Sequence, residues 1–141
     1  MKKCCYALMV MLMALVSVGL TACGSDEPEL DDIVGTWQYD NPDETAGFDL
    51  FYLFTKDGVF HIVEKSHETY IGRPNFFVHH GTYTVSGTKL KTTFYGDEVV
   101  TTESNFSVQG DRLMFFGEDE SASTTFTRVE DSVIEPYLQN I

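Results

Sequence analysis

Residues 76–95 read FFVHHGTYTVSGTKLKTTFY and predict two β-strands joined by a tight turn. Polar and apolar side chains alternate on both sides of Ser86-Gly87-Thr88, and β-branched and aromatic residues dominate both runs. A glycine between two alternating runs is typical of a hairpin. Because similar runs lie before and after it, this segment indicates an antiparallel all-β fold.

Eight strands are predicted when the same criteria are applied outward from this hairpin. They cover residues 33–40, 47–55, 59–66, 76–86, 89–95, 99–109, 112–117 and 122–129. In an up-and-down order, the connections after the second, fourth and sixth strands are tight and lie at one end. The other connections lie at the opposite end, and two of them are long. This pattern predicts an eight-stranded antiparallel up-and-down barrel with one closed end and one open end.

The first 22 residues predict an export signal. Lys2 and Lys3 precede an apolar run over residues 6–20, as in secretory signal peptides. Residues 20–23, Leu-Thr-Ala-Cys, resemble the lipobox of bacterial lipoproteins. The resemblance implies cleavage before Cys23, lipidation of Cys23 and a membrane anchor there. The alternative is a plain signal peptide with an incidental cysteine.

The mature chain is strongly acidic. The whole chain has 9 basic and 22 acidic residues, and loss of Lys2 and Lys3 leaves 7 basic residues against 22 acidic ones, a net charge of −15. This balance disfavours nucleic acid as a partner, because its phosphates need cationic side chains. Cys4 and Cys5 leave with the signal and Cys23 holds lipid, so cleavage there would exclude disulfides and thiol chemistry.

Residues 23–32 predict a lipidated cysteine followed by an extended acidic tether, with the sequence GSDEPELDD over 24–32. An acidic stretch directly after the cysteine resembles the surface-export signal of Bacteroidetes lipoproteins. A solvated linker is an equal alternative. The expected location is therefore the cell envelope, lipid-anchored in the outer membrane, with exposure at the cell surface if the resemblance holds.

Gly35-Thr36-Trp37 lies on the first predicted strand, and Arg128 ends the last one. The triplet matches the Gly-x-Trp motif of lipocalins, so the predicted barrel over residues 33–129 resembles the lipocalin-like domains of Bacteroidetes lipoproteins. The resemblance implies that Arg128 packs over Trp37 and closes the barrel, with a cation held over an aromatic face. The Thr-Asp-Tyr motif of lipocalins is absent. An unrelated eight-stranded meander with a core tryptophan is the alternative.

Alternation also assigns the inward side chains, among them Trp37, Phe54, Phe60 and Phe115. We expect a cavity whose candidate ligand-binding residues are Tyr52, Glu64, His79, Tyr83, Phe94 and Phe106. The second strand is apolar on both faces, so Phe51 and Leu53 point outward and need a cover. The tail over residues 130–141 has apolar residues at helical spacing, namely Val133, Ile134, Tyr137, Leu138 and Ile141. This spacing predicts a short helix or turn packed on the barrel. Alternatively, Phe51 and Leu53 contact another protein.

Glu64 and His79 are the strongest candidates for a polar ligand-binding or catalytic pair. The predicted pairing places them opposite each other and inward, where they could orient a ligand or act as acid and base. The alternatives are a cross-strand ion pair or a register slip that turns both outward. A metal site from His61, Glu64, His67 and Glu68 is disfavoured, because the two histidines are about 20 Å apart on an extended strand.

Charge is divided between the two ends of the predicted barrel. The open-end loops are acidic and contain Asp40, Asp43, Glu44, Glu68, Asp97, Glu98, Glu118, Asp119 and Glu120, against Arg73. Near the closed end lie Lys56, Lys89, Lys91 and Arg112. An acidic rim favours neutral or cationic ligands, and charge that serves only solubility is the alternative.

Three functional hypotheses follow from the sequence. The first is an envelope-anchored lipoprotein whose barrel binds a small neutral or apolar ligand. The second is a filled barrel that acts as a protein-interaction or accessory subunit of the envelope. The third, acid/base catalysis at Glu64 and His79, is a minority hypothesis, and no cofactor or resident metal is expected.

Overall fold

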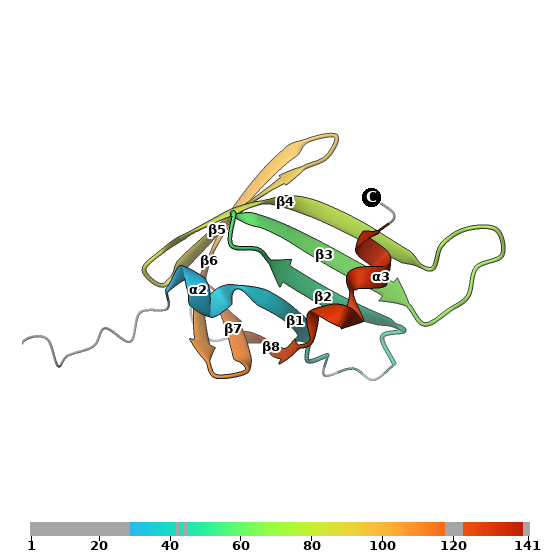
Figure 1. The fold of residues 1–141 in the computed structure, drawn as a ribbon, viewed down its shortest axis with the longest axis horizontal. Coiled ribbons are helices and arrows are strands. Elements are labelled where there is room, and N and C mark those ends of the chain that lie inside the picture. The colour runs from blue at the N-terminus through green and yellow to red at the C-terminus, as the bar shows by residue number, and fades with distance from the viewer. Residues whose placement is uncertain (1–28, 42, 44, 118–122, 140–141) are drawn as a thin grey trace, which may run out of the picture.

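The chain folds into a closed antiparallel barrel of eight strands (Figure 1). The computed structural model describes residues 29–41, 43, 45–117 and 123–139. Each strand pairs with the next, and the last pairs with the first. The strands are β1 (Gly35–Tyr39), β2 (Phe48–Phe54), β3 (Val59–Ser66), β4 (Phe76–Ser86), β5 (Lys89–Tyr95), β6 (Val99–Gln109), β7 (Arg112–Phe116) and β8 (Ser123–Val129). The predicted up-and-down barrel is confirmed, with every strand end within two residues of its predicted place.

A short helix, α2 (Leu30–Ile33), precedes β1, where the sequence predicted the end of an extended tether and the start of a strand. The Asp32 carboxylate accepts a hydrogen bond from the Glu29 N–H at 2.8 Å, which stabilises the first turn. Ile33 is fully buried, and its carbonyl accepts a hydrogen bond from Trp37 Nε1 at 2.8 Å. The extended prediction is therefore wrong for residues 30–33. The signal, Cys23 and residues 24–28 lie outside the described residues.

The barrel interior is packed with aromatic side chains toward its closed end. Trp37, Phe54, Phe60, Phe106 and Phe126 are each no more than 2% exposed. Their strands bring residues far apart in the sequence into one cluster, because each strand alternates one inward and one outward side chain. Alternation along the sequence assigned the first four of these residues to the interior correctly.

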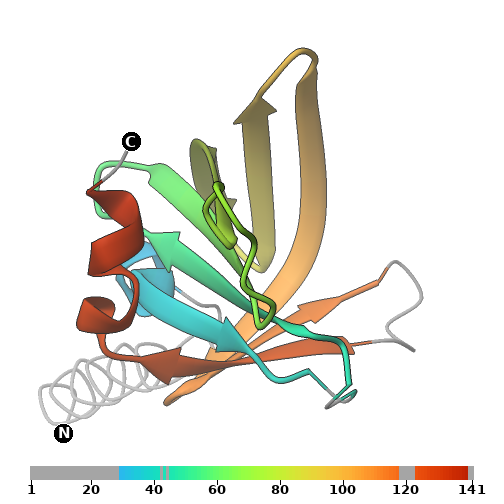
Figure 2. The same cartoon turned by 90° about the vertical axis from the view of Figure 1, so that its right-hand side faces the viewer.

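The C-terminal tail covers the outer face of β2 and β3 (Figures 1 and 2). It forms a 3-10 turn, η1 (Asp131–Val133), and a short helix, α3 (Glu135–Leu138). Ile134 is 1% exposed and packs in one buried cluster with Phe51 and Val63, while Leu53 borders that cluster. The predicted cover over Phe51 and Leu53 is thus confirmed, so these two side chains are not an exposed surface for another protein.

Two predicted members of this contact are not confirmed. Val133 was expected to pack on the barrel, but it is 42% exposed. Ile141 lies outside the described residues. The tail is also tied down by a polar contact, because the buried Thr36 hydroxyl donates a hydrogen bond to Asp131 Oδ1 at 2.6 Å.

The barrel wall is taller on one side than on the other. β4 and β6 have 11 residues each, whereas β1 and β7 have 5. β6 pairs with β5 from Val99 to Asn105 but pairs with β7 only from Asn105 to Gln109. Figure 2 shows the β5–β6 hairpin rising away from β7 and β8. Among the described residues, the upper half of β6 therefore extends past the end of β7.

Candidate ligand-binding site

The closed end of the barrel is held by an arginine over a tryptophan. Arg128 Cζ lies 4.1 Å from the Trp37 ring centroid, as the sequence predicts. Its two terminal nitrogens donate to the carbonyls of Val34 at 2.8 Å and Asp32 at 2.9 Å, so it joins α2 to β8. Gly35 has φ = 128°, and a Cβ there would lie 2.5 Å from Arg128 Nη1. The glycine of the motif therefore provides the space that the guanidinium occupies.

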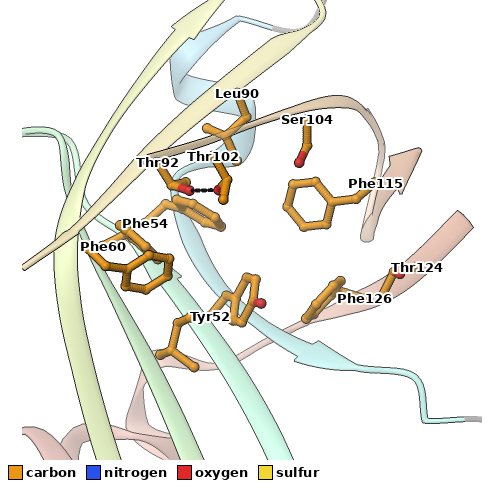
Figure 3. Close-up of a pocket in the computed structure, with 12 residues that line it drawn as sticks. Tyr52, Phe54, Phe60, Leu90, Thr92, Thr102, Ser104, Phe115, Thr124 and Phe126 are labelled. Carbon is orange, nitrogen blue, oxygen red and sulfur yellow. Dashed lines mark hydrogen bonds between the residues drawn. The ribbon is translucent and has the colours of Figure 1, made fainter. Parts of the chain in front are cut away.

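A cavity of about 240 Å³ lies above this closed end (Figure 3). Twelve residues line it, and none of them carries a formal charge. They are Tyr52, Phe54, Phe60, Ile62, Leu90, Thr92, Phe94, Thr102, Ser104, Phe115, Thr124 and Phe126. The lining combines aromatic rings with a smaller set of hydroxyl groups, which is the composition of a small-molecule pocket.

Aromatic contacts form one continuous wall of this cavity. The ring of Tyr52 lies 4.7 Å from that of Phe126, and Phe115 meets Phe126 edge-on at 5.6 Å. On the β3–β5 side, Phe60 and Phe94 make another edge-to-face contact at 4.8 Å. Such tilted and edge-on pairs hold rings in fixed orientations, so the wall is a preformed apolar surface.

Hydroxyl groups lie on the β5–β6 side of the cavity. Thr92 and Thr102 pair across the two strands through their hydroxyls at 2.7 Å. Ser104 points toward the space between the aromatic rings, and so does the Tyr52 hydroxyl from the other side (Figure 3). Within the described part of the chain, neither of these two hydroxyls makes a hydrogen bond to a protein group. They are available to a ligand or to water.

Burial raises the pKa of the Tyr52 phenol above its ordinary value. The phenol therefore stays neutral at physiological pH and can donate a hydrogen bond. Together with the uncharged lining, this favours neutral ligands over ionised ones, because an unpaired charge is costly to bury.

The predicted cavity residues divide into two groups. Tyr52 and Phe94 line the cavity as predicted. Tyr83 and Phe106 point inward but are only 4% and 2% exposed, and they belong to the packed core below the cavity. The Tyr83 hydroxyl is already used, because it donates to the Thr55 carbonyl at 2.5 Å. These two residues therefore have a structural role in this arrangement.

Glu64 and His79 are not opposite each other, so that prediction is wrong. Glu64 pairs with Phe77, and His79 pairs with Ile62, a shift of two residues from the predicted register. Both side chains are exposed and border different surface hollows near the open end. The long connection between β3 and β4 leaves the register undefined in the sequence.

Ten of the twelve cavity residues were not predicted as ligand-binding residues, and five of these ten lie on β6, β7 and β8. These five are Thr102, Ser104, Phe115, Thr124 and Phe126. Phe115 was assigned inward without a binding role. The polar upper half of β6 gave no hydrophobic signal, so only its alternating positions could have pointed to Thr102 and Ser104.

The histidines do not gather into a metal site. His61 faces His80 across β3 and β4, with ring centroids 6.3 Å apart, while His67 contacts the Asp49 carboxylate at 3.1 Å. No cluster of three or more His, Cys, Asp or Glu side chains suited to a metal ion occurs among the described residues. In the same part of the chain, no helix is long and apolar enough to cross a membrane.

The fold and site define an eight-stranded antiparallel barrel with an aromatic-lined, partly open interior. No protein-family model and no curated protein matches this chain. Among solved structures, the chain is similar to the Cpx pathway activator NlpE from Escherichia coli, with 19% sequence identity and a TM-score of 0.43. The similarity covers 69% of this chain and 46% of the NlpE chain.

Proposed function

We propose that this protein is a lipid-anchored envelope protein whose barrel binds a small, neutral, largely apolar molecule. One observation carries the proposal: the cavity is closed below by Arg128 and Trp37, is lined by aromatic rings, and presents the hydroxyls of Tyr52 and Ser104, which have no protein partner among the described residues. A protein interior is normally filled to crystal-like density, so an open aromatic cavity with unused hydrogen-bonding groups favours a ligand.

The size of the cavity limits the ligand. A cavity of about 150 Å³ accommodates benzene, and drug-sized pockets begin near about 300 Å³. The present cavity, at about 240 Å³, lies between these values. It suits a molecule of one or two rings, with polar groups on one edge that meet the hydroxyls and an apolar face that meets the aromatic wall.

The anchoring part of the proposal rests on the N-terminal sequence. The export signal over residues 1–22 and the lipobox-like cysteine at Cys23 support a lipid anchor in the cell envelope, with the outer membrane as the expected site. Acyl chains on Cys23 would retain the barrel at the membrane without any spanning segment, since each buried methylene contributes about 0.8 kcal/mol. Metabolic labelling with a radioactive fatty acid should label the wild type and not Cys23→Ala.

The ligand-binding part can be tested by native mass spectrometry of the protein from residue 24 onward. This chain keeps every described contact, because those contacts lie within residues 29–139. We expect extra mass that survives native conditions and leaves on denaturation. Ser104→Phe should abolish the extra mass, because its ring enters the cavity.

Thr84→Phe is the matched control, because Thr84 is exposed on the outer face of β4. It should retain the ligand. A bare polypeptide from the native host, or retention of the ligand by Ser104→Phe, would refute binding in this cavity.

A second candidate function is interaction with another protein. Phe77, Tyr95, Val99 and Val100 are between 48% and 66% exposed and lie on the neighbouring strands β4, β5 and β6. Exposed apolar residues on neighbouring strands favour a protein contact. By contrast, catalysis at Glu64 and His79 has lost its predicted geometric basis, because the two residues are offset by two positions and no hydrogen bond or ion pair joins them.

A further inference from the structure

The upper half of β6 is an open strand edge. Residues 99–104 pair with β5 on one side, and no strand among the described residues pairs with them on the other. Natural barrels and sheets normally protect such edges with lysines, prolines or bulges. Here the edge reads Val-Val-Thr-Thr-Glu-Ser, a segment of high β propensity without any of those features.

The backbone direction along this edge follows from one hydrogen bond. Phe106 donates its N–H to the Thr88 carbonyl, so even-numbered residues of β6 face β5. Because the groups alternate along an antiparallel strand, the N–H and C=O of Val99, Thr101 and Glu103 point away from β5. These three residues therefore offer six backbone groups to an added strand.

The edge is electrically neutral in an acidic protein. The whole chain has a net charge of −13. Glu103 is the single acid of the edge segment, and its carboxylate accepts a hydrogen bond from Lys89 Nζ at 2.7 Å. Val99 and Val100 are 66% and 48% exposed. Two copies can therefore approach along this edge without placing uncompensated like charges against each other.

We propose that the β6 edge pairs with the same edge of a second copy of this chain, antiparallel and centred on Thr101. Thr101 then faces Thr101 of the second copy, and Val99 faces Glu103 of the second copy on each side of the twofold axis. This register forms about six backbone hydrogen bonds, because all the free groups of both edges meet. A twofold interface of this kind closes on itself and does not propagate.

Charge complementarity selects the antiparallel arrangement over a parallel one. The acidic hairpin tip, with Asp97 and Glu98, lies at the open end, whereas Lys89 and Lys91 lie toward the closed end of the same hairpin. Antiparallel pairing brings the tip of each copy beside the lysine end of the other. A parallel pairing would bring the two acidic tips together.

Pairing would also complete the binding site. Thr102 and Ser104, on the upper half of β6, line the cavity. In the proposed register, Val100 and Thr102 of the second copy lie on the same inward face, next to these two residues. The second copy therefore extends the cavity wall. Self-association can nevertheless be tested without any ligand.

Sedimentation equilibrium of the protein from residue 24 onward, in about 0.15 M salt to screen net repulsion, tests the proposal. The wild type should reach a monomer–dimer equilibrium. Thr101→Glu and Thr101→Lys each place two like charges at the twofold axis and should raise the dimer dissociation constant roughly tenfold or more. An equimolar mixture of the two variants should restore the dimer, because opposite charges then meet.

Thr84→Glu is the control for added charge. Thr84 is exposed on β4, two strands from the edge, so this variant should dimerise like the wild type. Circular dichroism of each variant establishes that the barrel is folded. A wild type that stays monomeric at millimolar concentration would overturn the proposal. The same result is expected if another segment of the chain occupies the edge, and it would overturn the proposal in that case too. A dimer that tolerates both single variants would overturn it equally.

Discussion

Replacing Arg128 with alanine tests whether the closed end of the barrel depends on the guanidinium. The substitution removes a cation 4.1 Å from the Trp37 ring, worth about 1 kcal/mol. It also removes two charged hydrogen bonds, to Val34 and Asp32, each worth about 1 kcal/mol after screening, because the Arg128 side chain is 32% exposed. We expect Arg128→Ala to lower the free energy of unfolding by about 3 kcal/mol.

Urea unfolding followed by fluorescence measures this loss directly, because Trp37 is the single tryptophan of the chain and lies under the guanidinium. With an m-value of about 2 kcal/mol/M, the midpoint should fall by about 1.5 M. Arg128→Lys should lose about half as much, because it keeps the charge but not the planar fork. Arg112→Ala, at an exposed position, should stay within about 0.5 kcal/mol of the wild type. Equal midpoints for Arg128→Ala and Arg112→Ala would refute the reasoning.

Three further predictions concern the tail, a close backbone approach and pH. Ile134→Ala should cost about 2–4 kcal/mol of unfolding free energy because Ile134 is 1% exposed, whereas Val133→Ala should cost under about 0.5 kcal/mol; equal urea midpoints would contradict the tail packing. Gly81→Ala should cost more than about 3 kcal/mol in the same assay, because its Cβ would collide with the Thr93 carbonyl oxygen, and a near-neutral result would refute that contact. In the folded protein, burial and then the charge of His80 lower the pKa of His61 below 6.5. The unfolded chain therefore binds more protons than the folded one just below pH 6.5, so the free energy of unfolding falls as the pH drops through that window. The urea midpoint should therefore fall less between pH 7.5 and 5.5 in His61→Gln than in the wild type, and an unchanged pH dependence would contradict the shift.

The sequence predicted the barrel well because its turns and its alternation carry independent information. Glycine-containing turns define where β2, β4 and β6 end, and alternation defines which face of each strand is inward. The same reasoning predicted the cover over Phe51 and Leu53, because a strand with apolar residues on both faces needs a second layer packed on its outer face. The Arg128–Trp37 contact came from a family resemblance, and the structure supplies its geometry.

The candidate site was less predictable, because it depends on register and on strand length. Alternation gives the face of Glu64 and His79 but not which residue of β3 lies opposite which residue of β4. A connection of nine residues between these strands permits several registers, and a shift of two residues keeps both side chains on the same face. Residues 30–33 were missed for a similar reason, since burial of Ile33 against the barrel, rather than local composition, holds that segment in a helical turn.

The cavity and the open edge have one structural cause. β6 has 11 residues but β7 has only 5, so the upper half of β6 extends past the end of its neighbour. In the part of the chain that the structure describes, the backbone of Val99, Thr101 and Glu103 has no strand partner on that side, and Thr102 and Ser104 of the same segment line the aromatic cavity. A filled barrel needs matched strands, because side chains from every direction must meet at the axis. The mismatch therefore favours a barrel that binds something over one that is only a packed core. It also explains why ligand binding and self-association should share the same side of the molecule.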